Sequence, residues 1–97
     1  MKFMVQWRVF PELRHEVIKG FSMMSESDHQ NDLGGKIKLI GRWHDVSRFE
    51  GVAIVECDDP QALANWALNW NHAMDLDTSL VLDDDEVRAI GQARFSD

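Results

Sequence analysis

Two hydrophobic periods alternate along the chain. In residues 2–9, KFMVQWRV, every second side chain falls on one apolar side, which is the period expected of a β-strand. Residues 11–27 then place apolar side chains three and four positions apart, which predicts one amphipathic helix over that range. Pro11 suits the first turn of this helix because its missing N–H would have no partner there. The helix should fade into the polar stretch SESDHQND.

The same two periods predict the remaining elements. After a turn at Leu33-Gly34-Gly35 we expect strands over 36–46 and 51–57, a helix over 60–70 with Asp59 as its N-cap, a strand over 74–82 and a short helix opening at 83–86. The short gap between the two middle strands indicates an antiparallel hairpin.

The strand over 36–46 contains the residues of greatest chemical interest. Strict alternation places Trp43 on the helix-facing side of the sheet and Arg42 and His44 on the opposite side. Gly41 within this strand indicates a β-bulge or a close backbone approach. Only a bulge would bring Trp43 and His44 to one cavity, so the sequence alone leaves open whether these two side chains share a site.

The resulting order, β-α-β-β-α-β with a helical tail, predicts a ferredoxin-like α+β sandwich. This fold has a four-stranded antiparallel sheet with both crossover helices on one face. At 97 residues the chain is long enough for a single domain, so we assign 1–97 to one unit.

Composition narrows the range of partners. Ten Lys and Arg against 17 Asp and Glu give a net charge of −7, which disfavours nucleic acid and anionic membranes. Lys2 and Arg8 interrupt the apolar start of the chain, so we expect no signal peptide. The single Cys57 is typical of a buried thiol and fits a cytoplasmic location. We expect no metal, because the His and acidic residues lack ligand spacing, and no cofactor.

Because both predicted crossover helices cover the same side, the other face of the sheet is left without a helix. It should carry Met4, Arg8 and, depending on register, Val52 and Ile54, a mixture too apolar to remain exposed. We therefore expect a homodimer through the helix-free sheet face, in which two sheets form a dimeric α/β barrel.

Four sequence blocks resemble a known family. The segments MKFMVQWRV, GRWHDV, GVAIVECDDP and NWALNWNHAMDLD are similar to a small family of bacterial proteins described as a domain of unknown function, within the dimeric α/β-barrel superfamily. The residues that carry the resemblance are Trp43, Asp45, Glu56, Asp58, Asp59, Trp66 and Trp70. By analogy, the superfamily includes cofactor-independent quinol monooxygenases, haem-degrading monooxygenases, lactone isomerases and dehalogenase-like enzymes, and fold alone does not choose among them.

The four tryptophans have two interpretations. Trp7, Trp43, Trp66 and Trp70 could wall a cleft between helix and sheet for a flat apolar molecule. Alternatively, they fill the layer as ordinary core residues. Buried indole N–H groups need hydrogen-bond partners, which suits a mixed polar and apolar pocket.

Two histidines and two arginines are the candidates for chemistry. His44 could move a proton, and His72 corresponds by resemblance to a haem-ligating position, although Gln6 does not match the polar residue that accompanies it. Arg8 and Arg42, with Glu56, could form an interfacial ion network or hold a ligand carboxylate.

Three functions remain open from these residues. The first is binding of a small apolar or aromatic molecule in a Trp-lined cleft. The second is a cofactor-independent monooxygenase or isomerase in which His44 or His72 handles a proton. The third is a non-enzymatic interaction module whose tryptophans are all core.

Overall fold

The computed structural model describes residues 1–96. Its elements are β1 (Lys2–Val9), the short 3-10 helix η1 (Pro11–Leu13), α1 (Arg14–Ser22), α2 (Glu26–Leu33), β2 (Lys38–Asp45), β3 (Glu50–Glu56), α3 (Pro60–Trp70), β4 (Met74–Val81) and α4 (Asp84–Phe95). All four strands and the helix before β4 lie within two residues of their predicted bounds, as periodic segments should.

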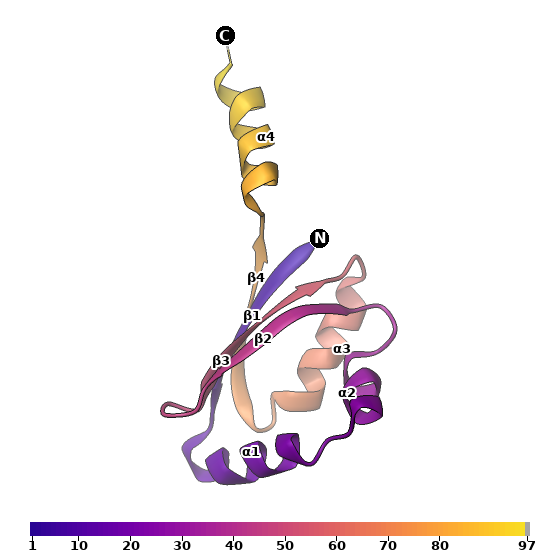
Figure 1. Ribbon diagram of the computed structural model, residues 1–97, viewed down its shortest axis with the longest axis vertical. Coiled ribbons are helices and arrows are strands. Elements are labelled where there is room, and N and C mark those ends of the chain that lie inside the picture. The colour runs from indigo at the N-terminus through magenta and orange to yellow at the C-terminus, as the bar shows by residue number, and fades with distance from the viewer. Residues whose placement is uncertain (97) are drawn as a thin grey trace.

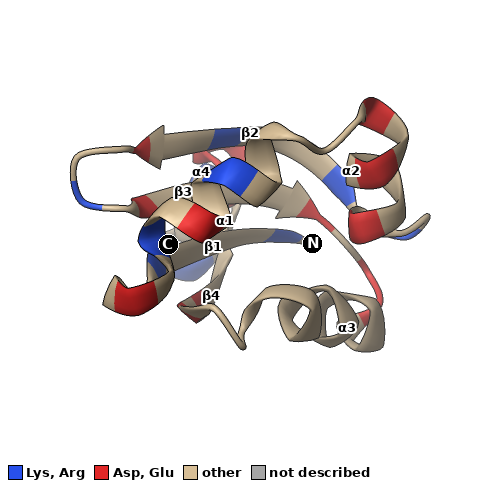
Figure 2. Cartoon of the chain, turned by 90° about the horizontal axis from the view of Figure 1, so that it is seen from below, with Lys and Arg blue, Asp and Glu red and all other residues tan. Residues whose placement is uncertain are grey.

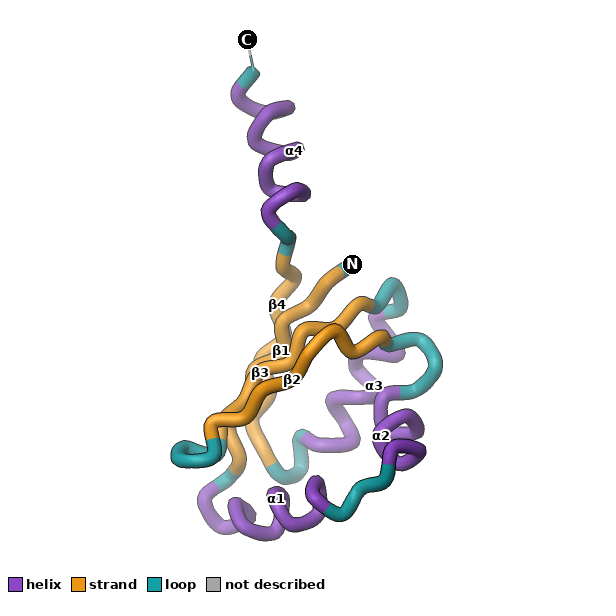
Figure 3. Tube along the Cα trace, viewed as in Figure 1, coloured by secondary structure: helices purple, strands orange, loops and turns teal. Residues whose placement is uncertain are grey.

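The four strands form one antiparallel sheet in the order β2-β3-β1-β4. Figure 1 shows α1, α2 and α3 on one side of this sheet and α4 extending away from it. Figure 3 shows β2 and β3 as a long curved hairpin closed by a tight turn. The arrangement confirms the predicted ferredoxin-like α+β fold.

The prediction of one helix over 11–27 is wrong. The chain forms η1 and α1, leaves the helical conformation after Ser22 and begins α2 at Glu26. Ser25 Oγ accepts a hydrogen bond from the Asp28 N–H at 3.1 Å, and the Asp28 carboxylate accepts one from the Ser25 N–H at 2.9 Å. This reciprocal capping box starts a new helix within a stretch that composition alone describes as polar.

A β-bulge in β2 reverses the facing that strict alternation predicts. Leu39 pairs with Val55, but the next pair joins Gly41 to Ile54, so Ile40 is an extra residue. Downstream of the bulge, Arg42 pairs with the fully buried Ala53 and therefore faces the helices.

The predicted facing of three site residues is therefore wrong. Trp43 lies on the helix-free face, where 60% of its surface is exposed. Arg42 and His44 lie on the helix-facing side. The bulge that Gly41 indicated is present, but it exchanges Trp43 and His44 between the two faces instead of bringing them together.

The core consists of two clusters beneath the helices. Val5, Ala53 and Val55 belong to the first, together with Trp66 of α3 and the buried Cys57. The second contains Val9, Ala73 and Met74. Trp7, Trp70 and Leu76 pack against both clusters, so the junction between them is aromatic.

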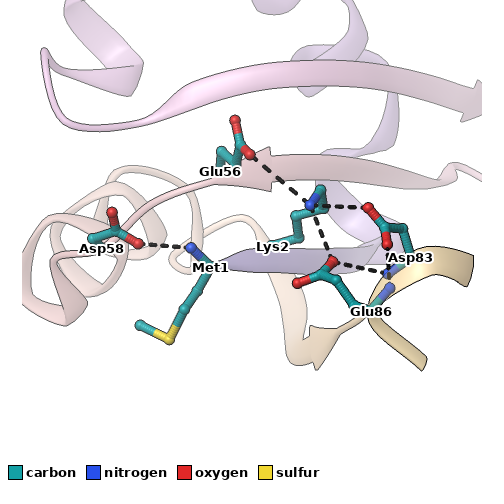
Figure 4. A network of polar contacts seen from close by, with 6 residues as sticks. All are labelled: Met1, Lys2, Glu56, Asp58, Asp83 and Glu86. Carbon is teal, nitrogen blue, oxygen red and sulfur yellow. Dashed lines mark hydrogen bonds and ion pairs between the residues drawn. The ribbon is translucent and has the colours of Figure 1, made fainter. Parts of the chain in front are cut away.

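A charged network holds the base of α4. Lys2 Nζ lies 3.1 Å from Glu86 Oε1 and 3.3 Å from Asp83 Oδ2, and Asp83 and Glu86 also form a capping box (Figure 4). Beyond this base α4 projects from the body, and the molecule extends 56 Å along its longest axis. Val87 and Ile90 of α4 are more than half exposed.

Gly51 gives a direct test of packing beside the hairpin. A Cβ at this position would clash with the Trp7 ring and lie 2.8 Å from the Trp43 carbonyl oxygen. We therefore expect Gly51→Ala to lower the free energy of unfolding by about 1–3 kcal/mol, measured by urea denaturation. The matched control is Gly20→Ala in α1, where a Cβ meets no atom within 4 Å. This substitution should raise the free energy of unfolding by about 0.5–1 kcal/mol, because alanine is a better helix former than glycine. Equal effects of the two substitutions would contradict the packing.

Candidate functional site

A cleft lies between the sheet, α1 and α3, at the junction of the two core clusters. Trp7 comes from β1, Phe21 from α1, and Trp66 and Trp70 from α3. The cavity volume is about 60 Å³. α3 has no charged residue, as its tan ribbon shows (Figure 2). Its cleft-lining residues are apolar: Leu63, Trp66, Ala67 and Trp70.

The indole N–H groups of α3 share one carboxylate acceptor. Trp66 Nε1 donates to Asp32 Oδ2 at 3.1 Å, and Trp70 Nε1 donates to Asp32 Oδ1 at 2.8 Å. Asn69 Nδ2 donates to Oδ1 as well, at 3.1 Å. Asp32 therefore joins α2 to α3 and fixes the orientation of two cleft-lining rings.

Sequence reasoning missed Asp32 because it lies in the polar stretch after α1. A signal was nevertheless present. Trp66 and Trp70 are four residues apart on one helix, so their N–H groups can point in the same direction and require a common acceptor.

His44 lies between two aromatic rings at the cleft. Its ring centroid is 5.5 Å from that of Trp7 and 4.9 Å from that of Phe21. His44 is an exposed residue overall, but partial desolvation of its ring, followed by the positive charge of Arg42, lowers the pKa of His44 below its ordinary value of 6.5. The imidazole is therefore mainly neutral at pH 7 and can accept a proton.

Arg42 lies on the same wall as His44. Its Cζ is 4.9 Å from the centroid of the Phe21 ring, which is a cation–π contact. Burial lowers the pKa of the guanidinium, and Asp32 partly opposes this effect. The group remains charged, so the cleft contains one fixed positive charge among aromatic rings.

Phe49 reaches the cleft from the hairpin turn. Its φ of 54° lies in the left-handed region, which is strained for a bulky residue. The ring lines the cleft and stacks on His15, with centroids 5.6 Å apart. Nothing in the residue pattern of the turn indicated this conformation.

A family model agrees with the sequence resemblance. The model described as a domain of unknown function, DUF3303, matches residues 1–95. The chain belongs to the DUF3303 family. No curated protein matches the chain.

Several residues that carried the sequence resemblance have framework roles in this DUF3303 chain. Asp45 Oδ1 accepts from the Ser47 N–H at 3.1 Å and the Arg48 N–H at 3.2 Å, which closes the hairpin turn. Asp59 caps α3 by accepting from the Gln61 N–H at 2.9 Å. Asp58 binds the N-terminal amine (Figure 4).

Three candidate residues of this DUF3303 chain lie away from the cleft. Trp43 is on the helix-free sheet face, as is Arg8, whose Nε is 3.0 Å from Glu50 Oε1. His72 is exposed in the turn after α3. The proposed grouping of Arg8 with Arg42 and Glu56 is therefore wrong, because the bulge turns Arg42 to the other side of the sheet.

Residues 1–96 contain neither a cluster of metal-ligating side chains nor a helix suited to a bilayer. No group of three or more His, Cys, Asp and Glu side chains is close enough there to hold a metal ion. In the same residues, no helix combines the length and apolar character needed to cross a bilayer.

The Asp32 contact predicts a measurable loss of stability. Asp32→Asn keeps the shape but replaces one acceptor oxygen with an NH₂ group that faces indole donors. We expect the free energy of unfolding to fall by about 1–3 kcal/mol, with a shift in tryptophan emission. Asp84→Asn makes the same change at an exposed position of α4, and its effect should stay within about 0.5 kcal/mol. An Asp32→Asn protein as stable as this control would contradict the shared-acceptor role.

Proposed function

We propose that this chain is a small-molecule-binding domain that holds a flat aromatic or otherwise apolar molecule in the cleft between the sheet, α1 and α3. The observation that carries the proposal is an unfilled cleft walled by Trp7, Phe21, Trp66 and Trp70. Aromatic walls with a few polar groups on one side are characteristic of ligand sites.

Ligand entry requires α1 to move outward. A cavity of about 60 Å³ is smaller than the ~300–1,000 Å³ of most ligand sites. None of the residues of α1 is buried, so the side chains of this helix have little covered surface to lose when it is displaced. Val17, Ile18 and Phe21 line the cleft from α1 and would then pack on the ligand.

A proton-transfer enzyme, such as a cofactor-independent monooxygenase or isomerase, is the second candidate. His44 supports it, because a neutral imidazole at an apolar cleft is suited to act as a general base. The hydrogen bonds from Trp66 and Trp70 to Asp32 support the third interpretation, an interaction module with structural tryptophans. Binding of a small molecule in the cleft would separate the first two from the third.

We also propose a homodimer through the helix-free face of the sheet. This face carries the exposed Trp43 beside Val52. It also carries charges of both signs, with Asp75 and Asp77 on the β4 edge and Lys38 on the β2 edge. A twofold arrangement that sets one edge against the partner's other edge pairs these charges. A stable interface of this kind needs about 1,200 Å² or more of total buried area.

Filling the cleft tests the binding proposal. Ala67 lines the cleft on α3, and Ala67→Leu should occupy the space that a ligand would use. We expect 2-naphthamide, an uncharged flat probe, to bind the unmodified protein saturably in calorimetry. Ala67→Leu should weaken this binding at least about tenfold, or 1.4 kcal/mol.

The matched control is Ala64→Leu, an exposed position of the same helix, which should bind the probe as the unmodified protein does. Absence of saturable binding to the unmodified protein would contradict the proposal. Equal weakening by both substitutions would place the probe outside the cleft.

A charge on the helix-free face tests the dimer. Trp43→Glu places a carboxylate where the partner's sheet would pack, so the dimer dissociation constant should rise at least about tenfold, measured by sedimentation equilibrium. Val46→Glu is the control, because Val46 is equally exposed but lies in the hairpin turn. A monomeric unmodified protein at micromolar concentration, or equal effects of the two substitutions, would contradict this interface.

A further inference from the structure

Arg42 differs from the paired cations of this chain. Lys2, Arg8, Lys36 and Arg88 each have a carboxylate oxygen within 4.0 Å. Arg42 is half-buried at the cleft, and its guanidinium lies over the face of the Phe21 ring. Within residues 1–96, no carboxylate oxygen lies within ion-pair distance of it.

A half-buried guanidinium without an anion is unfavourable for folding. Burial removes water from the charge, and an aromatic face replaces only part of that hydration. The lowered pKa of Arg42 records the same cost. Charges retained in this state are frequent at ligand sites, because the ligand supplies the missing partner.

The acidic groups around the cleft are already engaged. Asp32 accepts from the two indoles of α3, and Asp45 accepts from the turn residues that follow it. Glu50 is held by Arg8 at 3.0 Å. The guanidinium of Arg42 is therefore the charged group in the cleft that remains free to meet a ligand.

We infer that the cleft takes an aromatic or apolar ring bearing one carboxylate, with the ring against Trp7 and Trp70 and the carboxylate on the guanidinium of Arg42. This inference rests on the proposed function and names its ligand class. A planar guanidinium binds a carboxylate through two parallel hydrogen bonds, which also fixes the orientation of the ring.

His44 adds a pH-dependent contribution. It lies on the same wall as Arg42, between Trp7 and Phe21. When protonated, it is a second donor and a second positive charge for the carboxylate. Because a bound anion favours the protonated imidazole, affinity for the anion should rise as pH falls from 8 to 6.

A matched pair of probes tests the inference. 2-Naphthoate and 2-naphthamide share a ring system and differ in charge. In calorimetric titrations at pH 7 we expect the unmodified protein to bind the naphthoate at least about tenfold more tightly, a difference of 1.4 kcal/mol. Arg42→Met should abolish this preference while leaving binding of the amide within about threefold, because the apolar stem still covers Phe21. Arg94→Met, which removes an exposed arginine from α4, should keep the preference.

The outcomes separate the two proposals. Equal affinity of the unmodified protein for both probes would overturn the carboxylate inference and leave the binding function intact. Absence of saturable binding by either probe would overturn both. A preference lost equally in Arg94→Met would show general charge attraction and would also overturn the inference.

A pH series keeps the test independent of the folding of Arg42→Met. In the unmodified protein, the ratio of naphthoate to amide affinity should increase between pH 8 and pH 6. A ratio of one throughout this range would overturn the inference without any variant.

Discussion

One extra residue in β2 determines which side chains reach the cleft. Because side chains alternate across a strand, inserting Ile40 between two paired positions exchanges the faces of everything after it. Arg42 and His44 thereby enter the layer beneath the helices, and Trp43 leaves it. Without the bulge, the same eight-residue strand would present the indole of Trp43 to the cleft. Arg42 and His44 would then lie on the opposite face of the sheet.

The second constraint is a single carboxylate between two helices. Asp32 satisfies the N–H groups of Trp66 and Trp70, so these rings can form an apolar wall without leaving buried donors unpaired. The same contact places α2 against α3. The polar segment that forms α2, whose composition is typical of a loop, therefore supports the wall of the cleft. The cleft therefore depends on polar contacts outside it as much as on its aromatic lining.

The periodic elements of this molecule could be predicted from the sequence, whereas the features that depart from the periodic pattern could not. The four strands and α3 follow from hydrophobic period, and the hairpin follows from its short connection. Gly41 indicated the site of a bulge, but a glycine alone does not determine whether the register of the β2–β3 pairing shifts. The left-handed Phe49 depends on tertiary packing, which overrides local preference. Asp32 was missed because a carboxylate's partner 34 residues away leaves no local pattern.

The attachment of α4 has a consequence for how the chain unfolds. Twelve residues form this helix, and a helix of that length is marginal in water without tertiary contacts. Its base is tied to Lys2, while Ile90 and Phe95 farther along are exposed. The outer turns of α4 therefore constitute a separate cooperative unit with its own helix–coil equilibrium, whose fraying leaves the sheet and its tryptophans unchanged. Part of the far-ultraviolet ellipticity of this molecule should therefore be lost without a change in tryptophan emission.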